Sequence, residues 1–438
     1  MTDKKSIKLG LFLIMILCFL ILISGALISL DLSSDKADNN VKIAAPDNYK
    51  LDLTITWGGY STDIGRDICL DSSGNIYITG DTDTFGEGET DVFIVKYDSS
   101  GIQQWNATWG GTEYDYGKGI EVDALGNAYI VGTTSSFGVG YGNVFIAKYD
   151  NSGVQQWNIT WDMGTYTEAN EFALDSSGNI YITGSSGLDT FLAKFNSSGV
   201  YQWNITSGYY YGYDIVVETS GNIYIVGYDF ATNVDAVLVK YNSTGAYQWN
   251  RTLGGDESDN GWGVALDNSG NIYITGDYYD TSMNTLNIFV AKFNSSGDQV
   301  WNTTWGGNND EYGYDITLDD TGNIYITGAT YSFGVGYGDV FIAKYNNLGV
   351  LLWNDTWGGG SHDEGYGIAL DYSGNIYITG KYGISAYEAF ILRYIPSHPS
   401  GKETISLDLF FLIPLGMAIT TITIYETILK KKQKKIIY

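Results

Sequence analysis

Short runs in which apolar and polar residues alternate recur along the middle of the chain and predict strands. The most regular run, G-N-I-Y-I-T-G, occurs with two close variants seven times between residues 74 and 380, at intervals of 43 to 52 residues. Each copy is followed by an apolar run such as D-V-F-I-A-K-Y (339–345) and then by an alternating run such as V-Q-Q-W-N-I-T-W (154–161). A spacing near 50 residues indicates one supersecondary unit that is used repeatedly.

Each repeat contains four predicted strands bounded by Gly, Asn, Asp and Ser turns. Four antiparallel strands in each of seven repeats predict an all-β, seven-bladed β-propeller over residues 50–395. The last repeat lacks its fourth, Trp-rich strand, whereas an isolated copy of that strand opens the domain at 51–57. We therefore expect the N-terminal strand to complete the C-terminal blade and close the ring, which leaves no blade incomplete.

The combined pattern resembles a known repeat family. W-G-G-x-x-x-D-x-G, then I-x-L-D-x-x-G-N-x-Y-I-T-G, then D-x-F-x-x-K-Y, is similar to the seven-bladed β-propeller repeat of the SBBP type. The third and fourth units depart from it, because 161–170 and 207–214 lack the complete W-G-G and Asp element. The resemblance implies a secreted or surface propeller and implies no defined reaction.

Both ends of the chain carry apolar segments with basic flanks, which we expect to form helices. Lys4, Lys5 and Lys8 precede an apolar run long enough to be either a cleaved signal peptide or an uncleaved anchor. The C-terminal apolar run is closed by five lysines, as expected of a membrane span with its basic end inside. The predicted segments are 1–30 (signal peptide or signal anchor), 31–49 (linker), 396–405 (linker), 406–429 (transmembrane helix) and 430–438 (basic cytoplasmic tail). The propeller is then extracellular, on a chain that crosses the cell membrane once, or twice if the N-terminal segment stays.

The charge of the repeat region argues against one class of partner. The whole chain has a formal net charge of −27, and the region from 50 to 395 contains 12 basic and 42 acidic residues, or about −30. Such a field repels nucleic acid and attracts cations or basic partners, although acidic surfaces also simply keep secreted proteins soluble. The two cysteines, Cys18 and Cys69, cannot form a disulfide framework.

Five acidic residues occupy one position in five repeats and are the candidate metal ligands. Each stands six residues after the Trp of W-G-G, or after Leu253 in one unit, just before the predicted innermost strand. We expect these side chains to crowd the mouth of the central channel, where they either bind a cation such as Ca²⁺ or cap turns. They are Asp63, Asp115, Asp259, Glu311 and Asp363.

Other recurring residues are interpreted as scaffold. The Asp before each G-N turn is expected to cap a hairpin. The Lys of the third strand is expected to pair with a carboxylate between blades, because an unpaired buried charge is costly. Paired Trp residues four apart on the fourth strand share a face and are expected to pack blade against blade.

Nine N-x-S/T sequons are candidate glycosylation sites, and the N-S-S-G type among them also reads as ordinary turn sequence. Six lie in the fourth strand, the outer edge of its blade. The nine are Asn106, Asn158, Asn196, Asn204, Asn242, Asn250, Asn294, Asn302 and Asn354.

These patterns favour a binding or adhesion module whose ligand is an extracellular protein or a glycan. The alternatives are a structural component of a surface coat and a hydrolase or lyase acting on glycans. We expect no enzyme, because the residues that break the sevenfold pattern are few: His362, Arg66, Lys118, Arg251 and Lys381. The variable loops should share one face of the propeller, opposite the face where both linkers leave; Tyr49 and Ile395 should emerge opposite Phe85, Phe137 and Tyr279.

Overall fold

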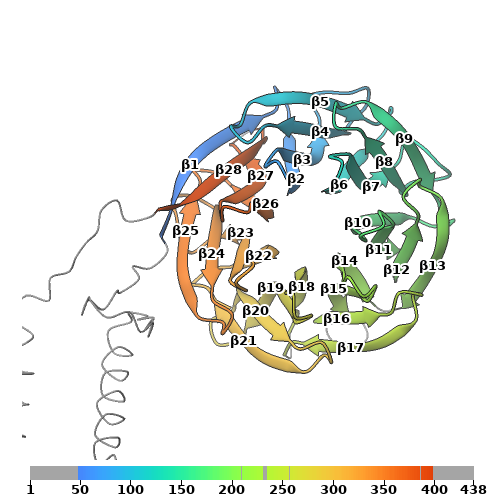
Figure 1. Cartoon of the computed structure of the whole chain (residues 1–438). Helices are drawn as coiled ribbons and strands as arrows, with labels where there is room; N and C mark the ends of the chain where they lie inside the picture. Colours follow the sequence, from blue (N-terminus) through green and yellow to red (C-terminus); the bar gives the residue numbers. More distant parts are fainter. Residues whose placement is uncertain (1–47, 209, 230–233, 256, 385, 398–438) are drawn as a thin grey trace, which may run out of the picture. The chain divides into compact units, whose positions relative to one another are not determined.

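A computed structural model describes residues 48–397 except 209, 230–233, 256 and 385. This part of the chain is all-β and folds into seven four-stranded antiparallel sheets arranged as the blades of a propeller (Figure 1). The predicted signal, the helical segments at both ends, the basic tail and almost all of both linkers lie outside the described residues. Within the described residues, no helix could cross a membrane.

The first four blades follow the chain in order. Their strands are β2 (Asp63–Leu70), β3 (Ile76–Thr82), β4 (Asp91–Tyr97), β5 (Gln103–Trp109); β6 (Asp115–Val122), β7 (Ala128–Thr134), β8 (Asn143–Tyr149), β9 (Gln155–Trp161); β10 (Thr167–Leu174), β11 (Ile180–Ser186), β12 (Asp189–Phe195), β13 (Tyr201–Gly208); β14 (Tyr210–Val217), β15 (Ile223–Asp229), β16 (Asp235–Tyr241), β17 (Tyr247–Leu253).

Blades five to seven repeat the arrangement, and the last takes one strand from the N-terminus. Their strands are β18 (Asn260–Leu266), β19 (Ile272–Asp280), β20 (Thr285–Phe293), β21 (Gln299–Trp305); β22 (Glu311–Leu318), β23 (Ile324–Thr330), β24 (Asp339–Tyr345), β25 (Leu351–Trp357); β26 (Glu364–Leu370), β27 (Ile376–Tyr382), β28 (Glu388–Ser397) and β1 (Asn48–Trp57).

The predicted closure of the ring is confirmed. The seventh sheet has the order β1-β28-β27-β26, so the first strand of the domain is the outer strand of the last blade. Arg393 on β28 forms an ion pair with Asp52 on β1, with 2.6 Å between the nitrogen and the carboxylate oxygen. The two ends of the domain are therefore joined by a strand ladder and by an ion pair.

The G-N turns are capped as expected. Asp71 Oδ1 accepts hydrogen bonds from the backbone N–H groups of Ser73 (2.9 Å) and Asn75 (3.0 Å), and Asp71 Oδ2 accepts one from the hydroxyl of Tyr77 (3.2 Å). Gly74 in this turn has φ +76°, a left-handed conformation that glycine adopts without strain. The five other blades with Asp at this position have the same backbone cap, whereas Glu218 of the fourth blade accepts from the side chains of Ser220 and Asn222.

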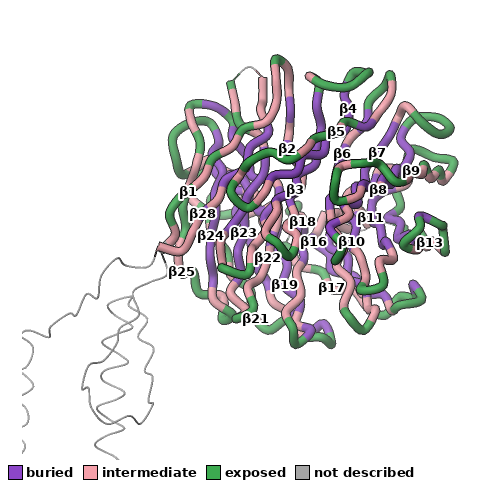
Figure 2. The backbone as a smooth tube through the Cα atoms, turned by 45° about the horizontal axis from the view of Figure 1, so that its top comes forward, coloured by how far each residue is buried: buried purple, intermediate pink, exposed green. Residues whose placement is uncertain are grey.

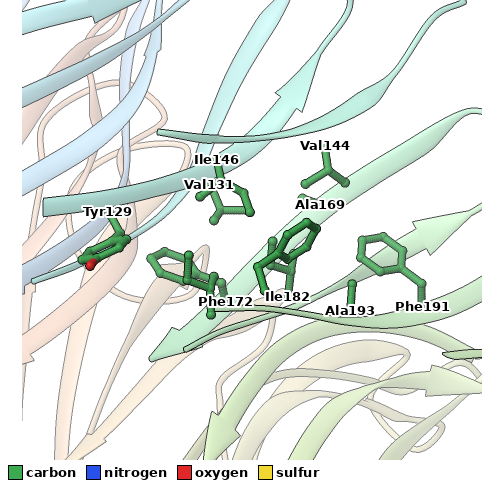
Figure 3. Close-up of a cluster of buried hydrophobic side chains, with 11 residues drawn as sticks. Tyr129, Val131, Val144, Ile146, Ala169, Phe172, Ile182, Phe191 and Ala193 are labelled. Atoms are coloured by element: carbon green, nitrogen blue, oxygen red, sulfur yellow. The ribbon is translucent and has the colours of Figure 1, made fainter. Parts of the chain in front are cut away.

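The apolar core lies between blades rather than inside one. Figure 3 shows one cluster, in which Val131 and Ile146 of the second blade pack against Phe172 and Phe191 of the third. Figure 2 shows the buried residues concentrated in the middle strands of each blade, with the exposed residues in the loops. Burial at every joint removes apolar surface from water and so holds neighbouring blades together.

The second Trp of the fourth strand confirms the predicted packing of blade on blade. Trp109 on β5 stacks on Phe145 of the next blade, with ring centroids 4.1 Å apart, and Trp57 stacks on Phe93 at the same distance. The Phe ring fits because its cross-strand partner is the last Gly of the G-N-x-Y-I-x-G motif: a Cβ on Gly132 would lie 2.7 Å from the Phe145 ring.

The joint between blades three and four lacks this aromatic contact. Ser207 stands where five blades have the second Trp and blade four has Leu253, and Val237 stands where the third strand of the other blades has Phe. A cavity of about 10 Å³ opens there beside Val237, Tyr210 and Gly227. Ser207 and Val237 therefore meet at one joint, which has a small cavity in place of the aromatic stack.

The third-strand lysines are arranged differently from the prediction. Their ammonium groups lie over the Tyr ring of the G-N-x-Y motif in their own blade, for example Lys148 4.5 Å from the centre of Tyr129. The carboxylate closest to Lys148 is Asp123, at 3.5 Å, which also belongs to the same blade. The expected pairing between blades is therefore wrong where a carboxylate partner is found. The Tyr ring of the neighbouring strand and the Asp of the turn before it, both in the same blade, already surround the ammonium group.

The two ends of the propeller differ in character. We call "loop face" the end formed by the loops that precede the first strand of each blade and those that join its second and third strands. We call "turn face" the end formed by the D-x-x-G-N and N-x-x-G turns. Phe85 packs on Trp57 at the loop face, whereas Tyr49, at the other end of the same strand, donates to or accepts from the hydroxyl of Tyr325, which bonds the turn residue Asp319. Pro396 lies against Gly374 of another turn. Both ends of the domain therefore emerge at the turn face, as predicted.

Candidate functional site

The five predicted metal ligands do not form one cluster. Each is at most 2% exposed, and none of the described residues forms a group of three or more acidic, His or Cys side chains that could hold a metal ion. Each carboxylate instead accepts the N–H of the second Gly of its own W-G-G element or its equivalent. Asp115 Oδ2, for example, accepts bonds from Gly111 N–H (2.8 Å) and from Ser136 Oγ (2.6 Å).

The expectation that these acids crowd the channel mouth is therefore wrong, and the turn-capping alternative matches their geometry. The physical reason is local: the acid begins the first strand, and its side chain folds back to tie two loops of its own blade together. The same bond is made by the other four members of the set: Asp63, Asp259, Glu311 and Asp363.

The first strand of every blade carries a bulge, and this bulge places different residues at the centre of the ring. The register between the first and second strands skips one residue, as between Gly65 and Asp67 in the first blade. A bulge re-aims a side chain relative to the regular pleat. In Figure 1 these first strands lie nearest the centre of the ring. The skipped residues, in blade order, are Arg66, Lys118, Asn170, Tyr213, Trp262, Tyr314 and Tyr366.

Variation between blades is concentrated at the bulge and at the residue pair beside it. The residue two positions before the bulge and its cross-strand partner are Ile64 and Asp81 in the first blade, but Glu364 and Lys381 in the last. The residue directly before the bulge is Gly in six blades and Ala169 in the third. Its cross-strand partner on the second strand is Gly in all seven blades. We call "axial wall" the residues that stand at three positions in all seven blades: the bulge, the residue two before it, and the cross-strand partner of that residue.

Four aromatic bulge residues in consecutive blades form an arc within this wall. Tyr213 lies 4.0 Å from Trp262, Trp262 lies 5.7 Å from Tyr314, and Tyr314 lies 5.3 Å from Tyr366, measured between ring centroids. The guanidinium of Arg66, in the first blade, lies 5.1 Å from the centre of the Tyr366 ring. All five side chains are half-buried, so solvent reaches part of each.

The cations of the wall are neutralised by acids of the same wall. Arg66 pairs with Asp81 at 2.7 Å, Lys118 with Glu168 at 3.4 Å and Lys381 with Glu364 at 3.3 Å. Three of the four charges that break the sevenfold pattern are therefore brought to the axis. The fourth, Arg251, donates to Gly297 O on the turn face and belongs to the scaffold.

His362 lies at the edge of the loop face, outside the wall itself. Its Nδ1 is 3.3 Å from the hydroxyl of Tyr331, and that hydroxyl donates to Glu364 at 3.4 Å. Glu364 also accepts a bond of 2.6 Å from Tyr366. Burial, then the charge of Glu364, raise the pKa of Tyr331 and Tyr366 far above the ordinary phenol value, so both hydroxyls keep their protons near neutral pH.

A second set of carboxylates follows the bulge and satisfies the free inner edge of the ring. The first strand has no neighbour on its axial side, which leaves backbone N–H groups unpaired. Asp67 accepts the N–H of its own Ile68 and of Ile120 in the next blade, each at 2.7 Å. Asp214 accepts the equivalent N–H groups of the fourth and fifth blades, and Asp315 accepts those of the sixth and seventh. Glu171 accepts the N–H of the third blade alone.

These inner carboxylates share one environment and one electrostatic consequence. Three blades have Gly at the acid position, Gly119, Gly263 and Gly367, so four acids serve the equivalent N–H group of all seven blades. Burial raises the pKa of Asp315 to about 6. Burial and then the charge of Asp315 raise the pKa of Asp67. Repulsion across the axis therefore favours protonation of part of this set.

Sequence reasoning singled out Arg66, Lys118 and Lys381 as breaks in the pattern but did not place them at the axis, and it missed the aromatic bulge residues and the inner carboxylates. It identified the acid of the W-G-G loops because that residue recurs. The wall has the opposite signal: its residues vary from blade to blade, while the positions beside them are almost always Gly. That signal was present in the aligned repeats, where Arg, Lys, Asn, Tyr and Trp replace one another at one position.

The blades, the closure and the variable axis define the chain as a seven-bladed β-propeller protein. Its repeats match the family model SBBP, described as Beta-propeller repeat, at residues 56–85, 108–138 and 348–381. The chain is thus a seven-bladed β-propeller in which three stretches match the SBBP repeat.

Two curated relatives are similar to this chain, one over most of its length and the other over about a quarter. The uncharacterized WD repeat-containing protein L264 of Acanthamoeba polyphaga mimivirus is 25% identical over 419 aligned residues, which cover 79% of this chain and 30% of that protein. The regulatory protein FlaEY of Caulobacter vibrioides is 27% identical over 128 residues, covering 26% of this chain and 13% of that protein. The chain spans less than a third of the length of either relative.

Proposed function

We propose that this chain is a membrane-anchored, extracellular binding module that holds a protein or glycan ligand on the loop face of its propeller. The observation that carries the proposal is the axial wall. In a repeat protein, residues that only maintain the fold recur from unit to unit, so a set that changes from blade to blade is free to serve a ligand. Binding residues also tend to lie on variable segments that a rigid scaffold positions.

The anchoring part of the proposal rests on the apolar, lysine-flanked segments at both ends of the sequence. Both termini of the domain leave the turn face, on the same side as Tyr49 and Pro396. A tether of about ten residues, such as 396–405, then keeps the turn face near the bilayer and directs the loop face outward. The geometry and the sequence thus support the same orientation.

Binding of the full chain to an array of extracellular proteins and glycans tests the proposal. Tyr337→Ser, at a loop tip, and Tyr314→Ala, in the axial wall, change the loop face. Leu125→Ser and Leu348→Ser change equally apolar residues of the turn face, which are 79% and 73% exposed against 75% for Tyr337. We expect at least one loop-face change to weaken binding at least tenfold and both turn-face changes to leave it within twofold. Loss with the turn-face pair alone, or no binding to any member of the array, would overturn the proposal.

A further inference from the structure

We propose that the axial wall is a binding site for a neutral oligosaccharide, held by the aromatic arc of Tyr213, Trp262, Tyr314 and Tyr366. This inference rests on the proposed binding function and names the ligand class and the site. The arc joins four consecutive blades through ring contacts of 4.0 to 5.7 Å. A sugar presents apolar C–H faces and hydroxyl groups together, and half-buried Tyr and Trp side chains offer an apolar body with a polar tip.

Polar groups of the wall supply hydrogen-bonding partners around the arc. Asn170 donates from its side chain to Gly212 O at 2.8 Å, which leaves its amide oxygen as an acceptor. The hydroxyl of Tyr211 donates to Glu168 at 2.9 Å, and Asn260 donates to Asp277 at 2.8 Å. These bonds fix the side chains in place before a ligand arrives, which lowers the entropic cost of binding.

The charges of the wall select against an acidic sugar. The wall contains three cations and four carboxylates, a net charge of −1, and each cation is already paired with a wall carboxylate. An anionic ligand would have to displace one of these pairs and would approach a domain of about −30. A neutral polyhydroxyl ligand meets neither cost.

The position of the wall favours the end of an oligosaccharide as the ligand over the flat surface of a protein partner. The bulge residues of the wall are half-buried and others of its residues, such as Asp277 and Glu364, are buried, whereas Val139, Tyr141 and Val335 on the loop tips are 75 to 78% exposed. The wall is therefore recessed behind a rim of loops, as ligand sites that surround a small or narrow ligand usually are. A peptide or protein ligand would instead be expected to use the exposed tips.

Titration of the full-length protein with matched oligosaccharides tests the inference. The probes are neutral oligomers of glucose, mannose, xylose and N-acetylglucosamine, and acidic oligomers of galacturonate and sialyl-lactose. We expect at least one neutral oligomer to bind and every acidic one to bind at least tenfold more weakly. Trp262→Ala and Tyr314→Ala should raise the Kd at least tenfold. Trp262→Phe, which keeps a ring and the packing, should raise it less.

Tyr141→Ser is the matched control, because it removes an exposed aromatic residue from the same face without touching the axis. Thermal unfolding of each variant separates a lost site from a lost fold. Unchanged binding in folded Trp262→Ala, or tighter binding of the acidic series, would overturn the inference. Binding of a protein partner that depends on the loop tips would overturn the inference while leaving the proposed binding function standing.

Discussion

The stack between Trp109 and Phe145 tests whether aromatic contacts between blades stabilise the ring. The perturbation is Phe145→Val, which gives the joint of blades one and two the residue that Val237 supplies between blades three and four. Phe145 is fully buried, and its ring lies 4.1 Å from Trp109 at an interplanar angle of 21°. Valine would lose that contact and leave space above Gly132.

The expected cost follows from the size of the group removed. Replacing a buried Phe by Ala costs about 3–5 kcal/mol, and an aromatic pair contributes roughly 0.5–1.5 kcal/mol beyond area burial. Valine retains part of the volume, so we expect Phe145→Val to lower the free energy of unfolding by about 2–4 kcal/mol. Val237→Ala, at the joint that already lacks the stack, should cost about 1–2 kcal/mol.

Urea unfolding of the propeller, followed by circular dichroism, measures both changes. Circular dichroism is preferred to Trp fluorescence because the next test replaces a Trp. A double-mutant cycle of Trp109→Ser with Phe145→Val should give a coupling energy of about 0.5–1.5 kcal/mol. The matched cycle of Ser207→Ala with Val237→Ala should give a coupling near zero. A Phe145→Val variant no less stable than Val237→Ala, or equal coupling at the two joints, would show that the stacks do not distinguish the joints.

Four further outcomes are expected. Stability should fall as pH rises from about 4 to about 8, because two acids have raised pKa values in the folded state: Asp315 (about 6) and Glu121 (about 7), a β6 residue that accepts the N–H of Leu174 at 3.0 Å. The folded state therefore keeps protons that the unfolded chain releases near pH 4. The trend should reverse below pH ~4, where the capping carboxylates with lowered pKa, such as Asp71, take up protons. A flat profile in a pH series of urea curves would contradict this reading. Deletion of 48–57 should abolish cooperative unfolding, because it removes Trp57, Asp52 and the outer strand of the last blade, whereas deletion of 31–45 should leave the melting temperature unchanged. Asp115→Asn should cost about 1–3 kcal/mol by weakening its bonds to Gly111 and Ser136; millimolar Ca²⁺ should shift neither protein's melting temperature, and a shift only in the unmutated protein would revive a cation site. In a glycosylating host, mass spectrometry should find glycans first at the exposed Asn106, Asn158, Asn302 and Asn354, and least at Asn196, whose Oδ1 caps its turn at 3.0 Å from Ser198 N; the reverse order would count against exposure as the deciding factor.

The sequence by itself determined the blades, their number and the closure of the ring. Strand position follows from local alternation and from turn residues such as Asp71 and Gly74, whose hydrogen bonds reach at most six residues along the chain. The isolated strand at 51–57 needed no coordinates to be assigned to the last blade, because a four-stranded repeat with one strand missing has one way to be completed. The faces at which Tyr49 and Phe85 emerge follow from strand direction alone.

Only the tertiary structure decided which residues meet at the axis. Arg66 and Tyr366 are 300 residues apart, and they touch because sevenfold closure brings the first strand of the last blade beside that of the first. A bulge in each first strand then aims one side chain away from the regular alternation, which no count of apolar positions reveals. The acid Asp115 was predicted at the mouth of the channel and ties together the loops of its own blade, whereas Asp67 and Asp315, at a position that is acidic in only four blades, lie at the inner edge of the ring. Repetition in sequence identifies the residues that hold a blade, and the geometry of the ring selects those that face its centre.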